Sequence, residues 1–333
     1  MIEISVLIVT YNSADVIQNC IESIIAYKRS TIEIVIVDNN SKDNTVEILK
    51  TYSKSITLIQ NHINVGFSRG MNQAYKRSTG KYVMTFNPDA TLYPDTLDKI
   101  IGSFENDPKV GLVAGVLFND EATYILPNRT LTLFDNSVTL HTTAKYLPSI
   151  QKNIQKTPLV FTCNWVIGTC MTVRRSILSP EYMYPEKSFL FWEEYDLCNQ
   201  VTKAEYKIIV NKSVKYKHET GTSFKFDVQK LKMAVRLSNA HKYRVKTEAF
   251  GTFLSKLSLA ASILDLSAFL LILYFKDIAS KSYNSYRKRV LNETSAIIMS
   301  DLELLMHGTS HVKKIDQEAT LFFNTQRLPH NAQ

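Results

Sequence analysis

The stretch Lys81–Asp89, KYVMTFNPD, is the part of the sequence that decides the fold. Its apolar run, Tyr82–Phe86, predicts a buried strand, and this strand must end at Asn87 and Pro88 because proline cannot donate to a β-ladder. Asp89 then stands just past the carboxyl end of a strand, where open α/β sheets bind ligands. A carboxylate there suits a divalent cation held against a diphosphate, and an Asx turn made by Asp89 is the alternative explanation.

The residues before this strand alternate between short apolar runs and helical patterns. The runs are typical of strands that are covered on both faces, and the segments between them carry apolar residues at helical spacing. We expect strands at Ile4–Val9, Ile32–Val37 and Ile56–Gln60, and helices at Ala14–Tyr27, at Thr45–Tyr52 and after the loop that begins at Asn64. This order predicts a doubly wound, mostly parallel central sheet with helices on both faces.

The pattern is looser after Asp89. We expect a helix at Tyr93–Phe104, strands at Val110–Phe118, Trp165–Arg174, Lys207–Val210 and Ser213–Tyr216, a helix at Phe191–Val201, and an irregular loop over the site at Glu121–Thr157. From Asn239 onward the pattern is mostly helical. We therefore predict an α/β domain at residues 1–227 and a basic, mostly helical C-terminal region at residues 228–333.

Charge is distributed unevenly between these two parts. The formal net charge is +8, and residues 228–290 alone hold twelve Lys and Arg against three acids. A near-neutral body with a basic appendage indicates that the appendage meets an anionic partner. The four cysteines form no CxxC pair and no metal-type spacing, so we interpret them as reduced and mostly buried. Together with the lack of a basic leader before the first strand, this favours a cytosolic chain.

One segment of the appendage approaches the length of a membrane span. Leu257–Phe275 is apolar apart from Asp265 and small polar residues, and its length is close to the roughly 20 residues that cross a bilayer. An Asp at the centre of a span costs about 2.5 to 3.5 kcal/mol on insertion scales. Because Lys256 and Lys276 also bracket the segment, we predict a helix that lies in the membrane plane or packs within the protein.

Polar clusters follow the ends of four expected strands. They are Thr10-Tyr11-Asn12, Asp38-Asn39-Asn40, the loop Asn64–Asn72, and Asn87-Pro88-Asp89. Because the carboxyl ends of parallel strands share one edge of a sheet, all four clusters can reach a single nucleotide. Asp38 would accept hydrogen bonds from a base or ribose, or else cap the following helix. The third glycine of GxGxxG is missing and no GxxxxGK[ST] occurs, which argues against a Rossmann dehydrogenase and a P-loop kinase.

Two further clusters come later in the chain. Trp192–Asp196, WEEYD, holds three carboxylates in four positions, whose repulsion a helix N-terminus, a metal or a shared proton would offset. One of these carboxylates is a candidate general base for a hydroxyl, and a solvated helix start is the alternative. His218 follows a strand candidate, so it is either a structural residue or part of a loop that returns to the phosphate site.

The order of these motifs resembles that of the family 2 glycosyltransferases with a GT-A fold. Within them it is most similar to the rhamnosyltransferase-like branch that builds bacterial surface polysaccharides such as O-antigen. The resemblance runs over about residues 3–225. Its matching segments are VLIVTYNS (Val6–Ser13), IVIVDNNSKD (Ile34–Asp43), NVGFSRGMNQA (Asn64–Ala74), FNPDA (Phe86–Ala90), WVIGTCMTVRR (Trp165–Arg175), FWEEYDLCNQV (Phe191–Val201) and HETG (His218–Gly221).

The resemblance implies a role for each matching position. The nucleotide would be held by Thr10, Asn12, Asp38, Asn64, Gly66, Arg69 and Asn87. Asp89 and His218 would bind Mg²⁺ or Mn²⁺ on the diphosphate. Glu194 or Glu193 would be the catalytic base, and Trp165 and Asp196 would contact the acceptor. Two positions depart from the family pattern: Asn87 replaces the first acid of a DxD-like motif, and Glu194 replaces the usual Asp, which leaves the base open between the two glutamates.

The resemblance also implies an activity and its partners. We expect an inverting, metal-dependent glycosyltransferase whose leading donor is dTDP-L-rhamnose, with UDP-sugars behind, and whose acceptor is a hydroxyl of a lipid-linked glycan. The chain would be cytoplasmic and peripheral at the inner face of the cell membrane, held there by its basic helices, which are also a candidate homodimer interface. No recognised nucleic-acid module appears, so nucleic acid is not an expected partner.

Two other functional classes compete with this interpretation. A non-catalytic nucleotide-sugar-binding or assembly scaffold protein would explain the departures at Asn87 and Glu194. A nucleotidyltransferase shares a similar sheet, but it normally carries a glycine- and lysine-rich loop after the first strand, and Thr10–Ser13 is not such a loop.

Overall fold

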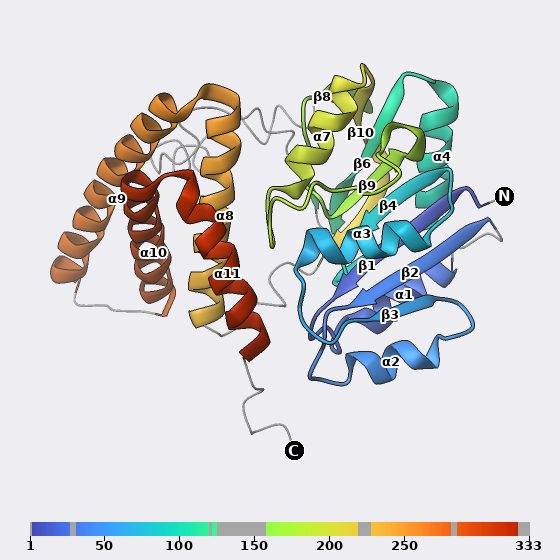
Figure 1. Cartoon of the computed structure of the whole chain (residues 1–333), viewed down its shortest axis with the longest axis horizontal. Coiled ribbons are helices and arrows are strands. Elements are labelled where there is room, and N and C mark those ends of the chain that lie inside the picture. Colours follow the sequence, from blue (N-terminus) through green and yellow to red (C-terminus); the bar gives the residue numbers. More distant parts are fainter. Residues whose placement is uncertain are drawn as a thin grey trace. The chain divides into compact units, whose positions relative to one another are not determined.

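The computed structural model of this chain describes residues 2–26, 31–119, 122–124, 158–218, 228–280 and 285–325. The chain divides into two compact units, drawn together in Figure 1. The sheet unit comprises Met1–Thr130, Thr157–Lys225 and Thr320–Gln333, and the helical unit comprises Leu131–Lys156 and Phe226–Ala319. The end of the chain, from Thr320, is therefore grouped with the sheet unit.

The sheet unit is organised on one mixed sheet, with the strand order β3-β2-β1-β4-β9-β6-β10-β5 and with β7 on β6 and β8 on β10. The strands β1 to β4 pair in parallel, β6 and β10 are also parallel, and β9 runs antiparallel between β4 and β6. The bounds are β1 Ile4–Thr10, β2 Ile32–Asp38, β3 Thr57–Gln60, β4 Tyr82–Phe86, β5 Ala90–Leu92, β6 Val110–Asn119, β7 Ala122–Tyr124, β8 Val160–Cys163, β9 Cys170–Arg174 and β10 Lys207–His218.

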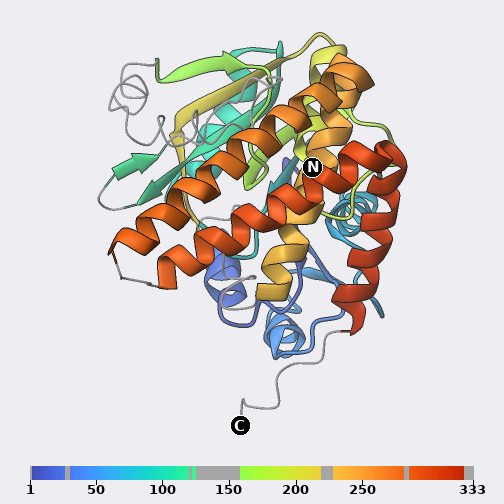
Figure 2. The same ribbon diagram turned by 90° about the vertical axis from the view of Figure 1, so that its left-hand side faces the viewer.

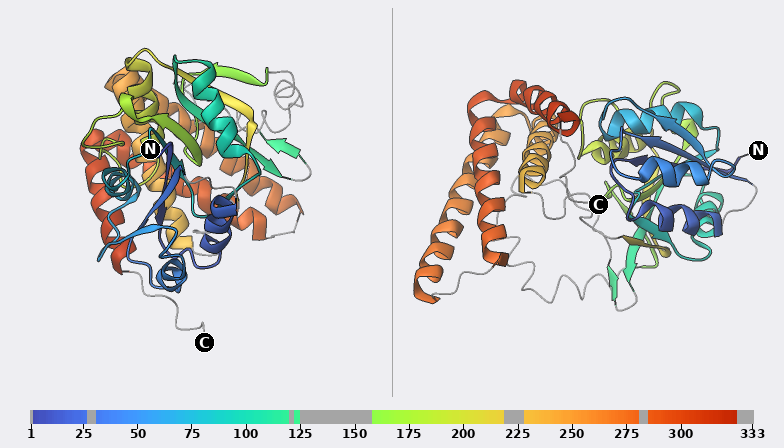
Figure 3. Two further views of the ribbon diagram at one scale, coloured as in Figure 1. Left: turned by 90° about the vertical axis from the view of Figure 1, so that its right-hand side faces the viewer. Right: turned by 90° about the horizontal axis from the view of Figure 1, so that it is seen from below.

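Helices cover both faces of this sheet (Figures 1 and 3). They are α1 Ile17–Ala26, α2 Thr45–Thr51, α3 Phe67–Arg77, α4 Thr96–Asn106 and α7 Glu193–Lys203, with a short 3₁₀ turn at Arg175–Ile177. Ile21 of α1 and Ile100 of α4 belong to the same buried cluster as Ile8 of β1. The helix α3 covers the opposite face, because a Cβ on Gly70 would contact Val9, the next residue of β1.

The buried strands explain why the sequence signal was strong in the first half of the chain. Every residue of β1 and of β4 is buried, as continuous apolar runs predict for strands covered on both sides. Tyr82, the first residue of β4, stacks on Phe104 of α4 with ring centroids 4.2 Å apart. The doubly wound α/β fold with a helical C-terminal region is confirmed.

Three expectations about the second half of the sheet need correction. The predicted strand Trp165–Arg174 begins at Cys170, and the residues before it form a loop. The two candidate strands after Lys207 are one strand, β10, whose register is interrupted between Val210 and Lys215 by an irregularity that the period-2 pattern does not show. The strand β8 was not expected, and the predicted loop Glu121–Thr157 lies outside the described residues apart from β7.

The helical unit contains α8 Val228–Phe250, α9 Thr252–Ser280 and α10 Ser285–His307, and α11 spans Thr309–Thr325. Figure 2 shows α9 and α10 side by side, and both pack against α8. The interior includes polar pairs, such as the hydroxyl of Ser262, which donates to Asp301 Oδ2 at 2.9 Å. Within the part of the chain that the structure describes, no helix combines the length and apolar character needed to cross a membrane.

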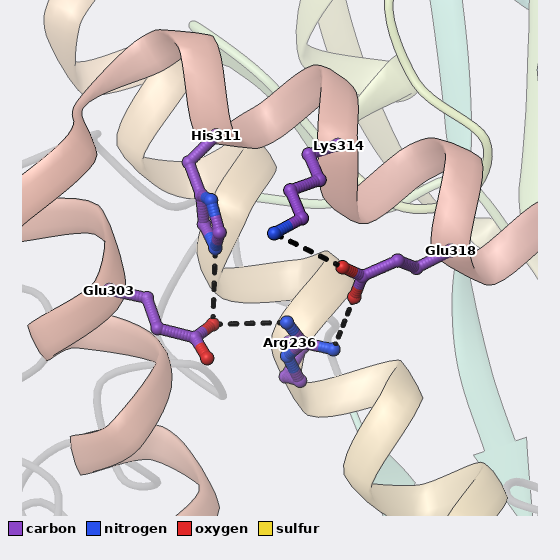
Figure 4. Close-up of polar contacts among 5 residues, drawn as sticks. All are labelled: Arg236, Glu303, His311, Lys314 and Glu318. Atoms are coloured by element: carbon purple, nitrogen blue, oxygen red, sulfur yellow. Dashed lines mark hydrogen bonds and ion pairs between the residues drawn. The ribbon is translucent and has the colours of Figure 1, made fainter.

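A charged cluster connects three helices of this unit (Figure 4). Arg236 of α8 donates to Glu318 of α11 at 2.8 Å and to Glu303 of α10 at 3.0 Å. His311 Nε2 lies 3.2 Å from the same Glu303 carboxylate, and Lys314 lies 4.0 Å from Glu318. These partly exposed pairs share their partners, so the cluster fixes how the three helices pack rather than adding independent surface ion pairs.

Candidate functional site

The carboxyl ends of β1 and β2 bring three of the predicted nucleotide residues together. Thr10 and Asp38 are buried, and the Thr10 hydroxyl donates to Asp38 Oδ1 at 3.0 Å. The other oxygen of Asp38 accepts the backbone N–H of Ser41 at 2.9 Å. Asn12 follows β1 with φ 52°, a left-handed conformation that asparagine tolerates. Asp38 does not cap α2, whose N-cap is Asn44, so the capping alternative for Asp38 is not what the structure shows.

The loop Asn64–Gly66 joins this strand edge at the start of α3. Asn64 Oδ1 accepts the N–H of Gly66 at 2.9 Å, and the Asn39 side chain donates to the Gly66 carbonyl at 3.1 Å. Gly66 has φ +85°, and a Cβ at this position would lie 2.5 Å from the Phe189 carbonyl oxygen. Only glycine satisfies both the conformation and the close approach, which accounts for the residue type that the motif carries here.

Arg69 is placed differently from the other predicted nucleotide residues. Its side chain is 62% exposed on α3, and its Nε donates to Glu186 Oε2 at 3.1 Å. Within the described residues, this arginine is thus paired at the surface rather than with the polar groups at the strand ends. Its predicted contact with the nucleotide would require it to leave Glu186.

The predicted cation residues meet where β5 pairs with β10. Ala90 lies opposite His218 in that antiparallel pair, so Asp89 and His218 are neighbours. Asp89 Oδ1 lies 2.9 Å from His218 Nε2, and Asn87 Nδ2 lies 3.4 Å from the same nitrogen. Both the Asp89 and the His218 side chains are nearly buried, with 11% and 12% of their areas exposed. The rest of the HETG motif, residues 219–221, lies outside the described residues.

The Asp89–His218 pair suits a cation whose other ligands come from a bound substrate. No group of three or more His, Cys, Asp or Glu side chains gathers at a metal-binding distance in the described part of the chain. Mg²⁺ is usually held in nucleotide-dependent enzymes by one or two carboxylates plus phosphate oxygens, and imidazole is an acceptable ligand for transition metals. Asp89 and His218 therefore fit a divalent ion whose remaining ligands include diphosphate oxygens.

The predicted base stands at the start of α7, after a strained turn. Phe191 and Trp192 have φ 75° and 67°, and each such left-handed residue costs on the order of 1–3 kcal/mol. The turn places Glu193 and Glu194 in the first turn of α7, where the helix dipole favours negative charge. Burial and, to a lesser extent, the charge of Asp196 nevertheless raise the pKa of Glu194 to about 7. A carboxyl that titrates near neutrality is suited to exchange a proton with substrate.

Glu193 has a different environment from its neighbour. Glu193 is 7% exposed. Burial and, after it, the negative charge of Glu193 raise the pKa of Tyr184 well above its ordinary value. Of the two glutamates, Glu194 is the one that retains partial exposure and faces the loop before β9. The geometry thus distinguishes two residues between which the sequence left the choice open.

A short segment, Gly168-Thr169, lies between the end of β4 and the start of α7. The Thr169 carbonyl accepts the N–H of Asn87 at 3.3 Å, and the Gly168 carbonyl accepts the Thr85 hydroxyl at 3.3 Å. On its other side, a Cβ on Gly168 would lie 3.6 Å from the Cβ of Glu194. The end of β4 and the start of α7 therefore contact neighbouring residues of one segment: Asn87 contacts Thr169, and Glu194 lies against Gly168.

The two predicted acceptor residues are more buried than expected. Trp165 is 4% exposed, with its ring centroid 5.6 Å from that of Trp192 and 6.2 Å from that of Tyr195. Asp196 is 5% exposed, and its carboxylate lies 3.8 Å from Lys187 Nζ. Trp192 and Tyr195 are less buried than Trp165, so they are the rings available to a sugar in this aromatic cluster.

Sequence reasoning missed several residues that this site uses. Asn39 lies in a recognised motif, but the sequence predicted a role only for its neighbour Asp38. Gly168 and Thr169 lay in a stretch read as continuous strand, where the glycine was the available signal for an interruption. Phe189, whose carbonyl accepts the N–H of Phe67 at 2.7 Å, carries no local signal because that contact depends on the tertiary fold.

The family model for glycosyl transferase family 2 matches residues 5–180, more than half of the chain. This chain belongs to glycosyl transferase family 2. The match runs from β1 through β9, so it includes the strand ends that carry Thr10, Asp38 and Asp89. It stops before α7, so the family model does not reach Glu194.

Curated relatives of this family 2 glycosyltransferase match a limited part of it. A poly-beta-1,6-N-acetyl-D-glucosamine synthase from Staphylococcus epidermidis is 29% identical over 114 residues, which is 34% of this chain and 28% of the relative. A glycosyltransferase of Escherichia coli, YibD, is 33% identical over 101 residues, which is 30% of this chain and 29% of that protein. The chain thus matches less than a third of the length of each relative.

Solved structures extend the likeness to the whole fold. The mannosyltransferase PcManGT from Pyrobaculum calidifontis, in complex with GDP-Man and Mn²⁺, superposes with a TM-score of 0.57. The superposition covers 91% of this chain and 87% of that protein, at 16% sequence identity. At this identity the likeness shows the fold alone.

The raised pKa of Glu194 predicts a pH dependence of stability. A carboxyl whose pKa is about 7 when folded and 4.5 when unfolded binds more protons in the folded state between these values, so the free energy of unfolding falls as pH rises from 4.5 to 7. Glu194→Gln cannot ionise, so we expect it to raise the melting temperature relative to wild type at pH 8 and to leave it nearly unchanged at pH 4.5. Differential scanning fluorimetry across this range measures the difference.

The exposed Glu181 offers a matched control for this measurement. Glu181→Gln removes the same charge at the surface and should give the same small difference at both pH values. A Glu194→Gln variant that is no more stable than wild type at pH 8 would contradict the buried, raised-pKa environment assigned to Glu194.

Proposed function

We propose that this family 2 glycosyltransferase is inverting and metal-dependent, and that it transfers a sugar from a nucleotide diphosphate to a hydroxyl of a lipid-linked glycan. The observation that carries the proposal is that the segment Gly168-Thr169 contacts both the start of α7, which holds a candidate base, and the end of β4, which leads to a candidate cation site. Glu194, whose pKa is about 7, lies against Gly168. The Thr169 carbonyl accepts the N–H of Asn87, whose side chain lies 3.4 Å from His218 Nε2 in the nearly buried Asp89–His218 pair. An inverting transfer needs such a base for the acceptor and such a site for the leaving diphosphate.

The proposed reaction is a single displacement in which Glu194 acts as the base. In one displacement, the acceptor oxygen forms a bond to the anomeric carbon of the donor sugar while the bond from that carbon to the diphosphate oxygen breaks. Glu194 takes the acceptor's proton, and the bonding electrons leave with the diphosphate. Because the pKa of Glu194 is about 7, the base form predominates only above neutral pH, so kcat/KM should rise as pH increases through 7.

The donor site would be built from the strand edge and the cation pair. Thr10, Asn12 and Asp38 would hold the nucleoside, with Asn64 and Gly66 beside them, and Asn87 next to the diphosphate. A divalent ion on Asp89 and His218 would supply charge stabilisation for the leaving diphosphate. Mn²⁺ and Mg²⁺ both suit this donor set, and the mannosyltransferase of similar fold, solved in complex with GDP-Man and Mn²⁺, supports this proposal. We propose dTDP-L-rhamnose as the leading donor, on the resemblance of the ordered motifs alone.

The acceptor side is proposed from the aromatic cluster and the helical unit. Trp192 and Tyr195 offer ring faces to a sugar, with Trp165 packed behind them. On α9, Phe253, Leu257 and Leu264 are 79%, 50% and 73% exposed at helical spacing, on a helix that also carries Lys256. Apolar side chains exposed beside basic residues are suited to an anionic membrane surface. This supports a peripheral location at the cytoplasmic face of the cell membrane, where a lipid-linked acceptor resides.

The assignment of Asp89 and Glu194 predicts how transfer responds to substitution. With a panel of dTDP-, UDP- and GDP-sugars and Mn²⁺, Asp89→Ala and Glu194→Gln should each lower turnover by about 10²-fold or more, because one loses an ion ligand and the other the base. Glu193→Gln tests the alternative base and should keep most activity. Turnover is measured as release of the nucleoside diphosphate in the presence of acceptor.

Two results would count against this assignment. If Asp89→Ala and Glu194→Gln both retain near-wild-type turnover, the site has been placed wrongly. If wild type binds a nucleotide-sugar but neither transfers nor hydrolyses any member of the panel, the scaffold class replaces the enzyme.

The membrane proposal predicts that the chain binds anionic vesicles. We expect flotation with liposomes that contain phosphatidylglycerol and little flotation with neutral phosphatidylcholine liposomes. Replacing Phe253 and Leu257 by serine should reduce flotation without affecting nucleotide binding. Equal recovery of this double variant and wild type with anionic vesicles would argue against α9 as the contact.

A further inference from the structure

The last helix of the chain ends on the candidate donor site. Residues from Thr320 onward are grouped with the sheet unit, although more than 100 residues separate them from the end of β10 at His218. Within this unit the end of α11 contacts two segments already assigned to the nucleotide: Tyr11, between Thr10 and Asn12, and Asn64. The proposal below concerns Phe323 and Asn324, which make these contacts.

Asn324 binds the main chain of Asn64 through both ends of its amide. Its Oδ1 accepts the Asn64 N–H at 2.7 Å, and its Nδ2 donates to the Asn64 carbonyl at 3.1 Å. The same Nδ2 donates to the Thr320 carbonyl at 2.7 Å, which fixes the amide on its own helix. Because the amide satisfies both backbone groups of one buried residue, it sets the position of that residue in two directions at once.

Hydrogen bonds connect Asn64 to the carboxyl ends of β1 and β2. The Asn64 side chain accepts the N–H of Gly66, whose carbonyl in turn accepts the side chain of Asn39. The backbone N–H of Asn39 donates to the carbonyl of Thr10 at 2.9 Å. A continuous series of hydrogen bonds therefore connects Asn324 to the two strand ends where the nucleoside is expected.

Phe323 makes a second, aromatic contact at the same place. Its ring stacks on Phe189 with centroids 5.6 Å apart and an interplanar angle of 8°, and it meets the ring of Tyr11 edge-on at 6.1 Å. Its carbonyl accepts the Tyr11 hydroxyl at 2.6 Å. The side chain of Tyr11 is thereby held by its ring and by its hydroxyl, so its orientation beside Thr10 depends on the end of α11.

We propose that the end of α11 supports the donor-nucleotide site from behind, with Asn324 positioning the Asn64–Gly66 loop and Phe323 positioning Tyr11. The ligand class is a nucleoside diphosphate, and the inference rests on the proposed function. Neither residue needs to touch the ligand. Their effect is to preorganise the loop and the ring that do, so that binding does not have to order them.

The test is nucleotide binding by full-length variants, measured by isothermal titration with Mn²⁺ and whichever of dTDP, UDP and GDP binds wild type best. Asn324→Ala removes both contacts to Asn64 and should raise Kd about tenfold, because nucleotide binding must then order the Asn64–Gly66 loop. Asn324→Asp keeps the acceptor for the Asn64 N–H but loses the donor, so its Kd should lie between those of wild type and the alanine variant. In transfer assays the loss should fall on KM for the donor more than on kcat.

Leu321→Ala is the matched control, because Leu321 lies on the same turn of α11 and is 66% exposed. It should bind nucleotide as wild type does. Hydrogen exchange of the Asn64 amide gives a readout that does not depend on the ligand. Exchange should be faster than wild type in Asn324→Ala and close to wild type in Asn324→Asp. If the alanine variant does not fold, the nucleotide affinity of the aspartate variant alone is compared with wild type.

The outcomes separate this inference from the proposed function. If wild type binds none of the three nucleotides, the proposed function fails, and this inference fails with it. If wild type binds and Asn324→Ala binds within twofold of it, α11 is only packed there and the inference is wrong. Tighter binding by Asn324→Ala would also overturn it, because the helix end would then obstruct the site.

Discussion

The hydrogen bond from the Asn87 N–H to the Thr169 carbonyl joins the two parts of the proposed site. On one side of it, the chain leaves β4 through Asn87 and Pro88 and reaches Asp89 beside His218. On the other side, Gly168 lies against Glu194 at the start of α7. Because β9 runs antiparallel to β4, its entry loop lies at the carboxyl end of β4, and a site that needs a cation and a base can be assembled there.

The first half of the fold and its polar clusters were predictable because their signals are local. The strands β1, β2 and β4 are buried on both faces and read as continuous apolar runs, and the polar residues at their ends follow directly in sequence. The second half is harder because its strands carry mixed patterns. β10 contains an irregularity, β8 is half exposed, and the glycine that interrupts the run from Trp165 to Arg174 was read as part of a strand.

The site shows the same division between local and long-range information. Asp38, Asp89 and Glu194 were proposed from motifs, and the different environments of Glu194 and Glu193 depend on the tertiary fold, which no spacing reveals. The contact between Asn64 and Asn324 spans 260 positions of sequence, so no pattern within a window could indicate it. Phe191 and Trp192 likewise carry no residue-type signal for the left-handed backbone that precedes α7.

The strained backbone at Phe191 and Trp192 and the raised pKa of Glu194 occur at the same place, the start of α7. A carboxylate at a helix N-terminus is ordinarily stabilised in its charged form, yet burial here outweighs that effect and brings its pKa to about 7. Folding therefore places a costly group at the site, as expected where geometry serves chemistry rather than stability. The Asp89 and His218 side chains are nearly buried in the same way, with Asp89 Oδ1 2.9 Å from His218 Nε2.

A crystal structure of the chain soaked with a nucleoside diphosphate and Mn²⁺ tests this account most directly. The account predicts an anomalous Mn²⁺ peak at coordination distance from Asp89, about 2.1 Å by analogy with octahedral ions of this kind, with the Glu194 carboxylate facing the open side of the diphosphate. A peak elsewhere, or a diphosphate bound away from the carboxyl ends of β1 and β4, would contradict it.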